Sequence, residues 1–297
     1  MTEKLDEIVD VIARRVSARL QEMGVTPKLA VAGCAGGDMC VNCGLCVEKK
    51  PEAVNNIVNF GATRIGANPG ISAQVDTKLA AMIDHTLLKP DATRDDLLKV
   101  CAEAKKYNFA TVCVNSSNIP LVARELRGTP VKAIAVVGFP LGAATTQAKV
   151  FESKEAIKAG AEEIDMVINL GALKSKDYRT VYEDIRQVVE ASRPYKTKVI
   201  IETSSLNNDE KIIACALSKT AGAAFVKTST GFAGGGATVE DIALMRRIVG
   251  ADMEVKASGG IRTKEDAEAM VKAGANRIGA SASVAIVTGK APKTGGY

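Results

Sequence analysis

The sequence predicts an α/β fold, a (β/α)₈ TIM barrel preceded by a helical and cysteine-rich extension. From residue 77 onward, eight short runs rich in β-branched residues alternate with amphipathic segments, which is typical of strand–helix units around a parallel sheet. Such a barrel takes about 250 residues, and the chain has 297. The first run is followed by HTLLKPDAT, which lacks the glycine-rich loop of an open doubly wound sheet, so we favour the barrel over that alternative.

Each predicted strand is a short, mostly apolar run. The segments between the strands repeat apolar residues three or four positions apart, as helices with one buried face do. The predicted strands span residues 81–86, 110–115, 132–138, 163–169, 198–203, 224–230, 253–260 and 276–281. The clearest predicted helices span residues 94–107, 149–160, 178–192 and 263–274.

The composition excludes several classes of function. The chain has one histidine, His85, so neither a histidine-rich metal site nor an HExxH helix can form, and a Ser-His-Asp triad would have to use this residue. The net charge of +5 and the aromatic content of 4% argue against a nucleic-acid surface. No apolar run is long enough to span a membrane, and the N-terminus lacks the apolar core of a secretory signal. We therefore expect a cytoplasmic protein without membrane or nucleic-acid partners.

The part of the chain before the barrel has two segments. Residues 3–23 repeat apolar side chains at helical spacing, and Gly24 and Pro27 end the predicted amphipathic helix. A stretch rich in small residues and cysteine follows. The predicted organisation is a helix and linker over 1–27, a cysteine-rich extension over 28–76, and a barrel with a flexible C-terminal tail over 77–297.

The cysteines fall into two groups. Three of them, Cys101, Cys113 and Cys215, lie in apolar or helical context, where we expect them to pack as small hydrophobic residues. The other four follow a C-x5-C-x2-C-x2-C spacing, at Cys34, Cys40, Cys43 and Cys46. They are compatible with an iron–sulfur cluster, with a zinc site, or with reduced thiols in a loop. The spacing matches neither a ferredoxin run nor a pair of zinc knuckles completely.

Three charged residues interrupt apolar strands of the predicted barrel. Asp165 lies between Ile164 and Met166, Lys227 follows Phe225 and Val226, and Lys256 follows Val255. Burying a charge is costly, and catalytic groups in barrels lie at the carboxyl ends of strands. Each charge alone could be a satisfied core group or point outward at the helices. Two lysines on neighbouring strands together with a carboxylate favour a catalytic site.

Amine chemistry suggests what this site does. A lysine whose pKa is lowered by burial or by a neighbouring cation can attack a carbonyl and form a Schiff base. Asp165 is then the candidate acid and base for the proton transfers. Small residues after the last two predicted strands, Gly259-Gly260 and Gly279-Ala280-Ser281, are either plain turns or a phosphate-binding cradle. Gly234–Gly236 would let a loop fold over the site.

Several long motifs in this order resemble the deoxyribose-phosphate aldolase family. They are IDHTLLKPDAT, VCVN, VVGFPLGA, EIDMVINLGALK, KVIIETSSL, FVKTSTGFAGGGATVEDIALM, VKASGGIRT and RIGASA, between about residues 77 and 288. The resemblance implies a class I aldolase that cleaves 2-deoxy-D-ribose 5-phosphate reversibly to D-glyceraldehyde 3-phosphate and acetaldehyde. It implies no metal or organic cofactor for catalysis.

The resemblance also implies roles for individual residues. Lys227 would form the Schiff base, and Asp165 and Lys256 would donate and accept protons. The residues that would line the substrate site are Asp84, Thr86, Cys113 and Thr230. The residues that match phosphate-binding positions are Gly231, Gly259, Gly260, Gly279 and Ser281.

Three further positions are compared with the family, and a homo-oligomer is expected. Phe232 stands where some family members have lysine, so one phosphate contact would differ. His85 has no role in the family and is expected to serve local packing. The final residue, Tyr297, resembles a terminal tyrosine that reaches the site in some members and would relay protons. We further expect a homo-oligomer, either a dimer or a tetramer.

The N-terminal helix has several interpretations. It could dock on its own barrel, support an oligomer, or bind a membrane surface, for which its basic residues are too few. It also resembles the encapsulation peptides of bacterial microcompartment enzymes, and acetaldehyde, a reactive product, gives a reason for enclosure in such a shell. For the whole chain, the alternatives are a Schiff-base aldolase of another phosphorylated sugar, or an inactive barrel used for interaction or redox sensing.

Overall fold

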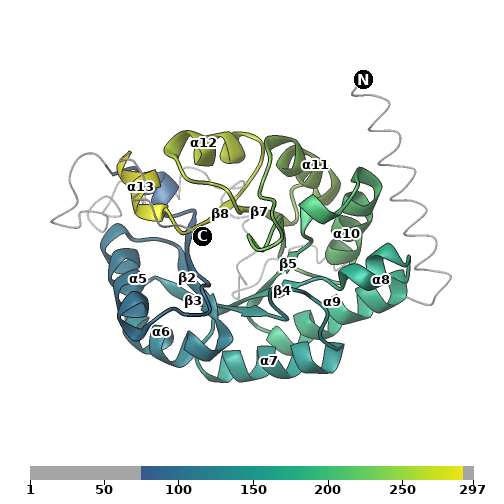
Figure 1. The fold of residues 1–297 in the computed structure, drawn as a ribbon, viewed down its shortest axis with the longest axis horizontal. Helices are drawn as coiled ribbons and strands as arrows, with labels where there is room; N and C mark the ends of the chain where they lie inside the picture. Colours follow the sequence, from purple (N-terminus) through teal and green to yellow (C-terminus); the bar gives the residue numbers. More distant parts are fainter. Residues whose placement is uncertain (1–74, 290–297) are drawn as a thin grey trace, which may run out of the picture. The chain divides into compact units, whose positions relative to one another are not determined.

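The computed structural model describes residues 75–289, and these form a closed barrel of eight parallel strands surrounded by helices (Figure 1). The expectations for segments 1–27 and 28–74, with the four clustered cysteines, and for Tyr297 lie outside the described residues. Within residues 75–289, no helix is both long and apolar enough to cross a membrane. The same range holds no group of three or more His, Cys, Asp or Glu side chains that could bind a metal ion.

The strands follow one another around the barrel in sequence order, and β8 pairs with β1 to close it. Their bounds are β1 Ile83–Leu87, β2 Thr111–Asn115, β3 Lys132–Val137, β4 Glu163–Val167, β5 Lys196–Ile200, β6 Phe225–Lys227, β7 Glu254–Ser258 and β8 Arg277–Ala280. The predicted TIM barrel is therefore confirmed. The fifth strand begins at Lys196, two residues earlier than its apolar run suggested, because the polar residues 196–197 also pair with β4.

The helices lie around the outside of the strands, as Figure 1 shows. Their bounds are α4 Thr77–Ala80, α5 Arg94–Tyr107, α6 Ile119–Leu126, α7 Thr146–Lys158, α8 Leu170–Lys174, α9 Tyr178–Ser192, α10 Asn208–Thr220, α11 Val239–Val249, α12 Lys264–Lys272 and α13 Ser283–Thr288. Two short 3₁₀ turns, η2 Ser116–Asn118 and η3 Thr203–Ser205, follow β2 and β5. Capping boxes begin α5, α10 and α12 with Thr93, Asn207 and Thr263, whose side chains satisfy backbone N–H groups of the first turn.

The strands separate two kinds of side chain. Ile164, Met166, Val226 and Val255 belong to the large apolar core between the strands and the helices. Since side chains alternate along a strand, the residues between them point into the barrel. The barrel interior is divided in turn: Leu88, Cys113, Ile134 and Val136 form a separate apolar cluster with Phe139, whereas β1 and β4 to β8 contribute charged residues.

His85 points to the outside of the barrel, where it joins β1 to α5 and α13. Its Nδ1 lies 2.9 Å from Ser283 Oγ and its Nε2 lies 2.9 Å from Glu103 Oε2. The Ser283 hydroxyl also lies 2.8 Å from the carbonyl oxygen of Ala280. The imidazole therefore joins Ser283 on α13 to Glu103 on α5. The hydrogen bond with His85 lowers the pKa of Glu103.

We predict that His85→Leu destabilises the protein without harming its chemistry. The variant leaves Ser283 and Glu103 without their partner, which should lower the free energy of unfolding by about 1–3 kcal/mol. Because the ring points away from the barrel interior, kcat/KM should stay within about twofold of wild type. Denaturant unfolding and steady-state kinetics on the same preparation measure the two effects. A loss of kcat/KM in fully folded His85→Leu would assign the imidazole to catalysis instead.

Candidate active site

Asp165 is the point where three buried lysines meet. Its Oδ2 lies 2.9 Å from Lys227 Nζ and 2.7 Å from Lys256 Nζ, and its Oδ1 lies 2.9 Å from Lys198 Nζ. Strand register explains the convergence, because Lys227 pairs with Lys256 across β6 and β7, and Asp165 pairs with Lys198 across β4 and β5. The structure thus brings together the two lysines and the carboxylate that the sequence singled out.

Asp84 is the second carboxylate of the cluster. Its Oδ1 accepts hydrogen bonds from Thr111 Oγ1 and from Arg277 Nη1, both at 2.7 Å. Its Oδ2 lies 2.6 Å from Lys256 Nζ. Lys256 is therefore held between Asp84 and Asp165, with all three side chains buried.

The lysines differ in how many carboxylates they contact. Lys256 pairs with Asp84 and Asp165, and Lys198 pairs with Glu163 and Asp165. Among the described residues, Lys227 forms an ion pair with Asp165 alone. An ammonium ion without sufficient negative partners is costly to bury, so Lys227 is the group that can most easily give up its proton.

The pKa shifts follow from these contacts. Burial lowers the pKa of Lys227, Asp165 opposes this in part, and Lys256 lowers the pKa further. Burial also disfavours the charge on Lys256, but Asp165 and Asp84 outweigh it and raise the Lys256 pKa. Although burial alone would raise the pKa of Asp165, the surrounding lysines hold it well below its usual value. The site therefore combines an amine whose pKa is lowered, an ammonium ion and a carboxylate, which are the groups that carbonyl addition and proton transfer require.

Sequence reasoning missed Lys198, Glu163 and Arg277. Lys198 is the first residue of the predicted strand 198–203, a position where a lysine usually points to solvent. Its position in the sequence therefore provided no reason to place it in the site. A signal was present, because Glu163 is two residues from Asp165 and must share its face of β4. The contact that joins Lys198 to both carboxylates depends on the pairing of β4 with β5, which a single sequence does not reveal.

The other expected substrate residues lie near the carboxyl ends of the strands. Burial raises the pKa of Cys113 to about 11, so its thiol is neutral at physiological pH and belongs to the apolar cluster of the interior. The Thr86 hydroxyl donates to the carbonyl of Asp84 at 2.9 Å. Thr230 donates its hydroxyl, at 2.5 Å, and its backbone N–H, at 3.0 Å, to Glu202 Oε2. Glu202, a buried residue that sequence reasoning also missed, therefore fixes Thr230.

Glycine allows close approach at two places in this region. A Cβ on Gly236 would lie 2.5 Å from the carbonyl oxygen of Gly259, so the loop after β6 packs directly on the loop after β7. Gly279, expected at a phosphate position, lies buried within β8, where a Cβ would stand 3.0 Å from Lys256 Cε. Its missing side chain leaves room for Lys256. Gly259, Gly260 and the exposed Ser281 do follow β7 and β8, at the end where phosphate binds in many barrels.

Phe232 makes an aromatic contact across the loops at this end of the barrel. Its ring packs edge-to-face against Phe139, with ring centroids 5.3 Å apart. Phe139 follows β3 and contacts the interior apolar cluster, whereas Phe232 follows β6 and is 43% exposed. Where some family members have a lysine, this chain therefore has an apolar contact between two loops.

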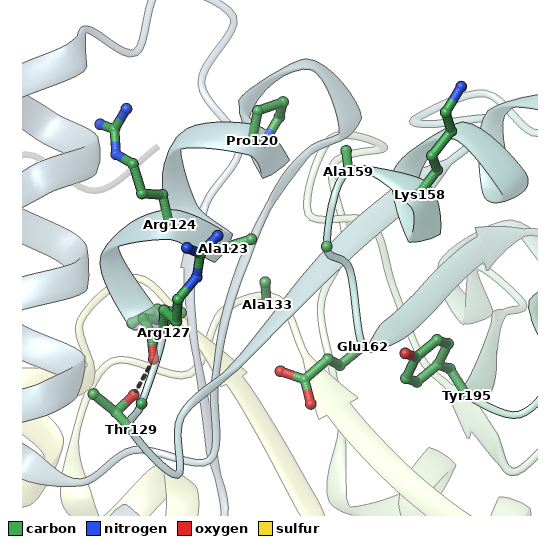
Figure 2. Close-up of a pocket in the computed structure, with 13 residues that line it drawn as sticks. Pro120, Ala123, Arg124, Arg127, Thr129, Ala133, Lys158, Ala159, Glu162 and Tyr195 are labelled. Atoms are coloured by element: carbon green, nitrogen blue, oxygen red, sulfur yellow. Dashed lines mark hydrogen bonds between the residues drawn. The ribbon is translucent and has the colours of Figure 1, made fainter.

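A pocket of about 480 Å³ lies at the opposite end of the barrel (Figure 2). Thr129, Glu162 and Tyr195 line it and lie shortly before β3, β4 and β5, so the pocket is at the amino ends of the strands. Figure 2 shows Arg124 and Arg127 on one side of it and Glu162 with Tyr195 on the other. None of the lysines bound to Asp165 lines this pocket.

The fold and the lysine–carboxylate cluster define a barrel aldolase of the Schiff-base class. The family model of DeoC/LacD family aldolases matches residues 78–291. The chain belongs to this family, and it is therefore a lyase that acts on carbon–carbon bonds.

Individual relatives agree with this membership. The deoxyribose-phosphate aldolase of Clostridium novyi (strain NT) is 62% identical over 216 residues, which cover 72% of this chain and 97% of that protein. The deoxyribose-phosphate aldolase of Bacillus cytotoxicus is 60% identical over 210 residues, which cover 70% of this chain and 94% of that protein.

Solved structures of deoxyribose-phosphate aldolases also superpose on this chain. A putative deoxyribose-phosphate aldolase from Coccidioides immitis superposes with a TM-score of 0.70 at 43% identity, covering 80% of this chain and 96% of that one. The tetrameric deoxyribose phosphate aldolase from Aeropyrum pernix has a TM-score of 0.67 at 33% identity, covering 71% of this chain and 90% of that one.

We predict that Gly279→Ala impairs catalysis by displacing Lys256. The added methyl group would stand 3.0 Å from both Lys256 Cε and Ser258 Cβ, so the lysine must move away from its two carboxylates. Such a displacement should lower kcat/KM about tenfold to a hundredfold. The matched control is Gly171→Ala on the exposed surface of α8, where the nearest atom to a new Cβ is 3.6 Å away. Equal kinetics for the two variants would show that Gly279 does not set the position of Lys256.

Proposed function

We propose that this chain cleaves 2-deoxy-D-ribose 5-phosphate reversibly to D-glyceraldehyde 3-phosphate and acetaldehyde, through a Schiff base on Lys227. The observation that carries the mechanism is that Lys227 pairs with one shared carboxylate while Lys256 has two. The substrate is supported by relatives of about 60% identity that are named deoxyribose-phosphate aldolase.

The reaction begins when the neutral amine of Lys227 adds to the C1 carbonyl of the open-chain sugar. Loss of water from the adduct gives a protonated imine, which draws electrons out of the bond between C2 and C3. Removal of the C3 hydroxyl proton lets that bond break, releasing glyceraldehyde 3-phosphate and leaving an enamine on Lys227. Protonation of the enamine at C2 and hydrolysis of the resulting imine release acetaldehyde and regenerate the amine.

Lys256 and Asp165 are the proposed proton donors and acceptors. The Lys256 ammonium lies 2.7 Å from Asp165 Oδ2, and the same oxygen lies 2.9 Å from Lys227 Nζ. A proton can therefore pass between Lys256 and the carboxylate beside the reacting nitrogen. Asp84 keeps Lys256 charged until the adduct needs a proton to lose water.

The phosphate is proposed to bind where the loops after β6, β7 and β8 meet. Gly231, Gly259, Gly260 and Ser281 offer backbone N–H groups and a hydroxyl there, and α12 begins nearby at Lys264. Phe232 supplies no charge at this end, so in this chain phosphate recognition would depend on these neutral donors. The C2 carbon of the sugar, which carries no hydroxyl, suits the apolar cluster that includes Cys113.

Two alternatives remain weaker. A Schiff-base aldolase of another phosphorylated sugar would use the same lysine, and only competition between substrates separates it from the proposal. A catalytically silent barrel used for interaction or redox sensing would have no need to keep Lys227, Lys256 and Asp165 in mutual contact at such a cost of burial.

The remaining expectations stay predictions. They concern iron–sulfur or zinc binding by the four N-terminal cysteines, targeting or docking by residues 1–27, a proton relay by Tyr297, assembly into a dimer or tetramer, and a cytoplasmic or microcompartment location. Metal analysis of anaerobically purified protein, against a variant with serine at all four cysteines, tests the first of these.

We predict that borohydride reduction in the presence of substrate attaches mass to Lys227. Wild type and Lys256→Leu should be labelled at this residue, the variant more slowly, and Lys227→Leu should not be labelled. The same Lys227→Leu change should lower kcat by about a thousandfold or more, since no other amine in the cluster is neutral. Peptide mass spectrometry locates the label. A label on Lys256 would reverse the two roles, and an unlabelled wild type would contradict the proposed mechanism.

A further inference from the structure

A second layer of charge lies between the lysine site and the amino end of the barrel. It consists of Glu163 on β4, Lys198 on β5 and Arg277 on β8, which we call the base cluster. Glu163 and Lys198 are buried, and the Arg277 side chain is 14% exposed. Lys198 hydrogen-bonds to Glu163 Oε2, and Arg277 Nη1 lies 3.6 Å from the same oxygen. Glu163 thus joins the two cations of this layer.

The base cluster holds both active-site carboxylates from one side. Lys198 binds Asp165 Oδ1 at 2.9 Å, and Arg277 binds Asp84 Oδ1 at 2.7 Å. In each carboxylate the other oxygen, Oδ2, faces Lys256. The orientation of the two groups that surround Lys256 is therefore set by cations that do not reach the reacting atoms.

An aromatic ring stabilises these cations. Lys198 Nζ lies 5.2 Å and the Arg277 guanidinium carbon lies 5.5 Å from the centroid of the Phe225 ring. Phe225 is two residues before Lys227, on the same face of β6. Cation–π attraction in a buried site favours the charged form of both groups.

The net charge of the base cluster and the lysine site together depends on whether Lys227 carries a proton. The groups joined by direct ion pairs include three carboxylates, on Asp84, Glu163 and Asp165, and four basic groups, on Lys198, Lys227, Lys256 and Arg277. With every group ionised the cluster carries one excess positive charge, and with Lys227 neutral it carries none. A buried cluster is most stable when its charges balance, so the neutral amine is a property of the whole set.

We propose that Arg277 and Glu163 are positioning residues that set this charge balance and thereby keep Lys227 as the neutral amine. The inference rests on the proposed function of Lys227. Neither residue contacts Lys227, so each acts through Asp84, Asp165 and Lys198. Loss of the Arg277 charge leaves one excess negative charge, which protonation of Lys227 cancels. Loss of the Glu163 charge leaves one excess positive charge, which drives Lys227 further toward its neutral form.

Other charged groups near Lys227 do not disturb this count. The groups facing it are Asp165 on β4, Lys256 on β7 and the neutral Cys113 thiol on β2. Glu202, after β5, is bound to Thr230. At the amino end, Lys196 and Glu254 are partly exposed and pair with each other at 3.0 Å.

The test measures imine formation with acetaldehyde as a function of pH, by single-turnover borohydride trapping. Acetaldehyde carries no phosphate, so the ionisation of a substrate does not contribute to the profile. The rate rises with pH as Lys227 loses its proton, because only the neutral amine attacks. In Arg277→Met the midpoint of this rise should move upward, and in Glu163→Gln it should move downward, each by about half a pH unit or more.

A matched control breaks a buried ion pair elsewhere. Lys149 on α7 and Asp184 on α9 pair at 2.6 Å between the helices, and both are as buried as Glu163. Lys149→Met should lower stability and leave the midpoint unchanged. Arg277→Lys keeps the charge with a different shape, so it should keep the wild-type midpoint even where kcat/KM falls.

Opposite shifts in Arg277→Met and Glu163→Gln support the proposal, because a merely structural role gives shifts in one direction or none. Unmoved midpoints, shifts of the same sign, or an Arg277→Lys midpoint equal to that of Arg277→Met would overturn it. If Arg277→Met does not fold, the proposal is still tested by two results: it requires a downward shift of the midpoint in Glu163→Gln and an unchanged midpoint in Arg277→Lys. Failure to trap wild type at any pH would instead refute the proposed function of Lys227.

Discussion

The arrangement of this site depends on one constraint: Asp165 is the shared ion-pair partner of three buried lysines. A single carboxylate cannot neutralise three buried ammonium ions. Lys256 and Lys198 each have a second carboxylate, and Lys227 has none among the described residues. In the proposed mechanism, the reacting amine is therefore the lysine with the fewest carboxylate partners. The carboxylates beside Lys256 and Lys198 raise the pKa of both side chains, which favours their ammonium forms.

The parallel barrel makes this selection possible. The strands are parallel, so residues at matching positions on different strands lie at the same level of the barrel interior. This arrangement brings Asp165, Lys227 and Lys256 together although they are far apart in the sequence. The loops at the carboxyl end add neutral donors for an anion, and the β2–β3 side of the interior adds an apolar surface. Charged side chains on β1 and β4 to β8 and an apolar surface near β2 and β3 suit the proposed substrate, which has a carbonyl, a deoxy carbon and a phosphate.

The sequence allowed the barrel and the centre of the site to be predicted, for identifiable reasons. Eight β-branched runs mark the strands, and charges at Asp165, Lys227 and Lys256 stand out because apolar residues flank them. Lys198 and Arg277 begin or precede apolar runs, where charge is ordinary, so only strand register reveals their contacts. The family resemblance implies a phosphate-binding role for Gly279. Its closeness to Lys256 depends on the pairing of β7 with β8, which a single sequence does not reveal.

The proposed mechanism requires that, before substrate arrives, Lys227 is the neutral amine and Lys256 and Lys198 are ammonium ions. Neutron diffraction from crystals of the substrate-free protein at neutral pD locates the protons on these groups directly. We expect two deuterons on Lys227 Nζ, three each on Lys256 Nζ and Lys198 Nζ, and none on Asp165. Three deuterons on Lys227, together with two on Lys256, would contradict the account, because the lysine with two carboxylate partners would then be the neutral amine.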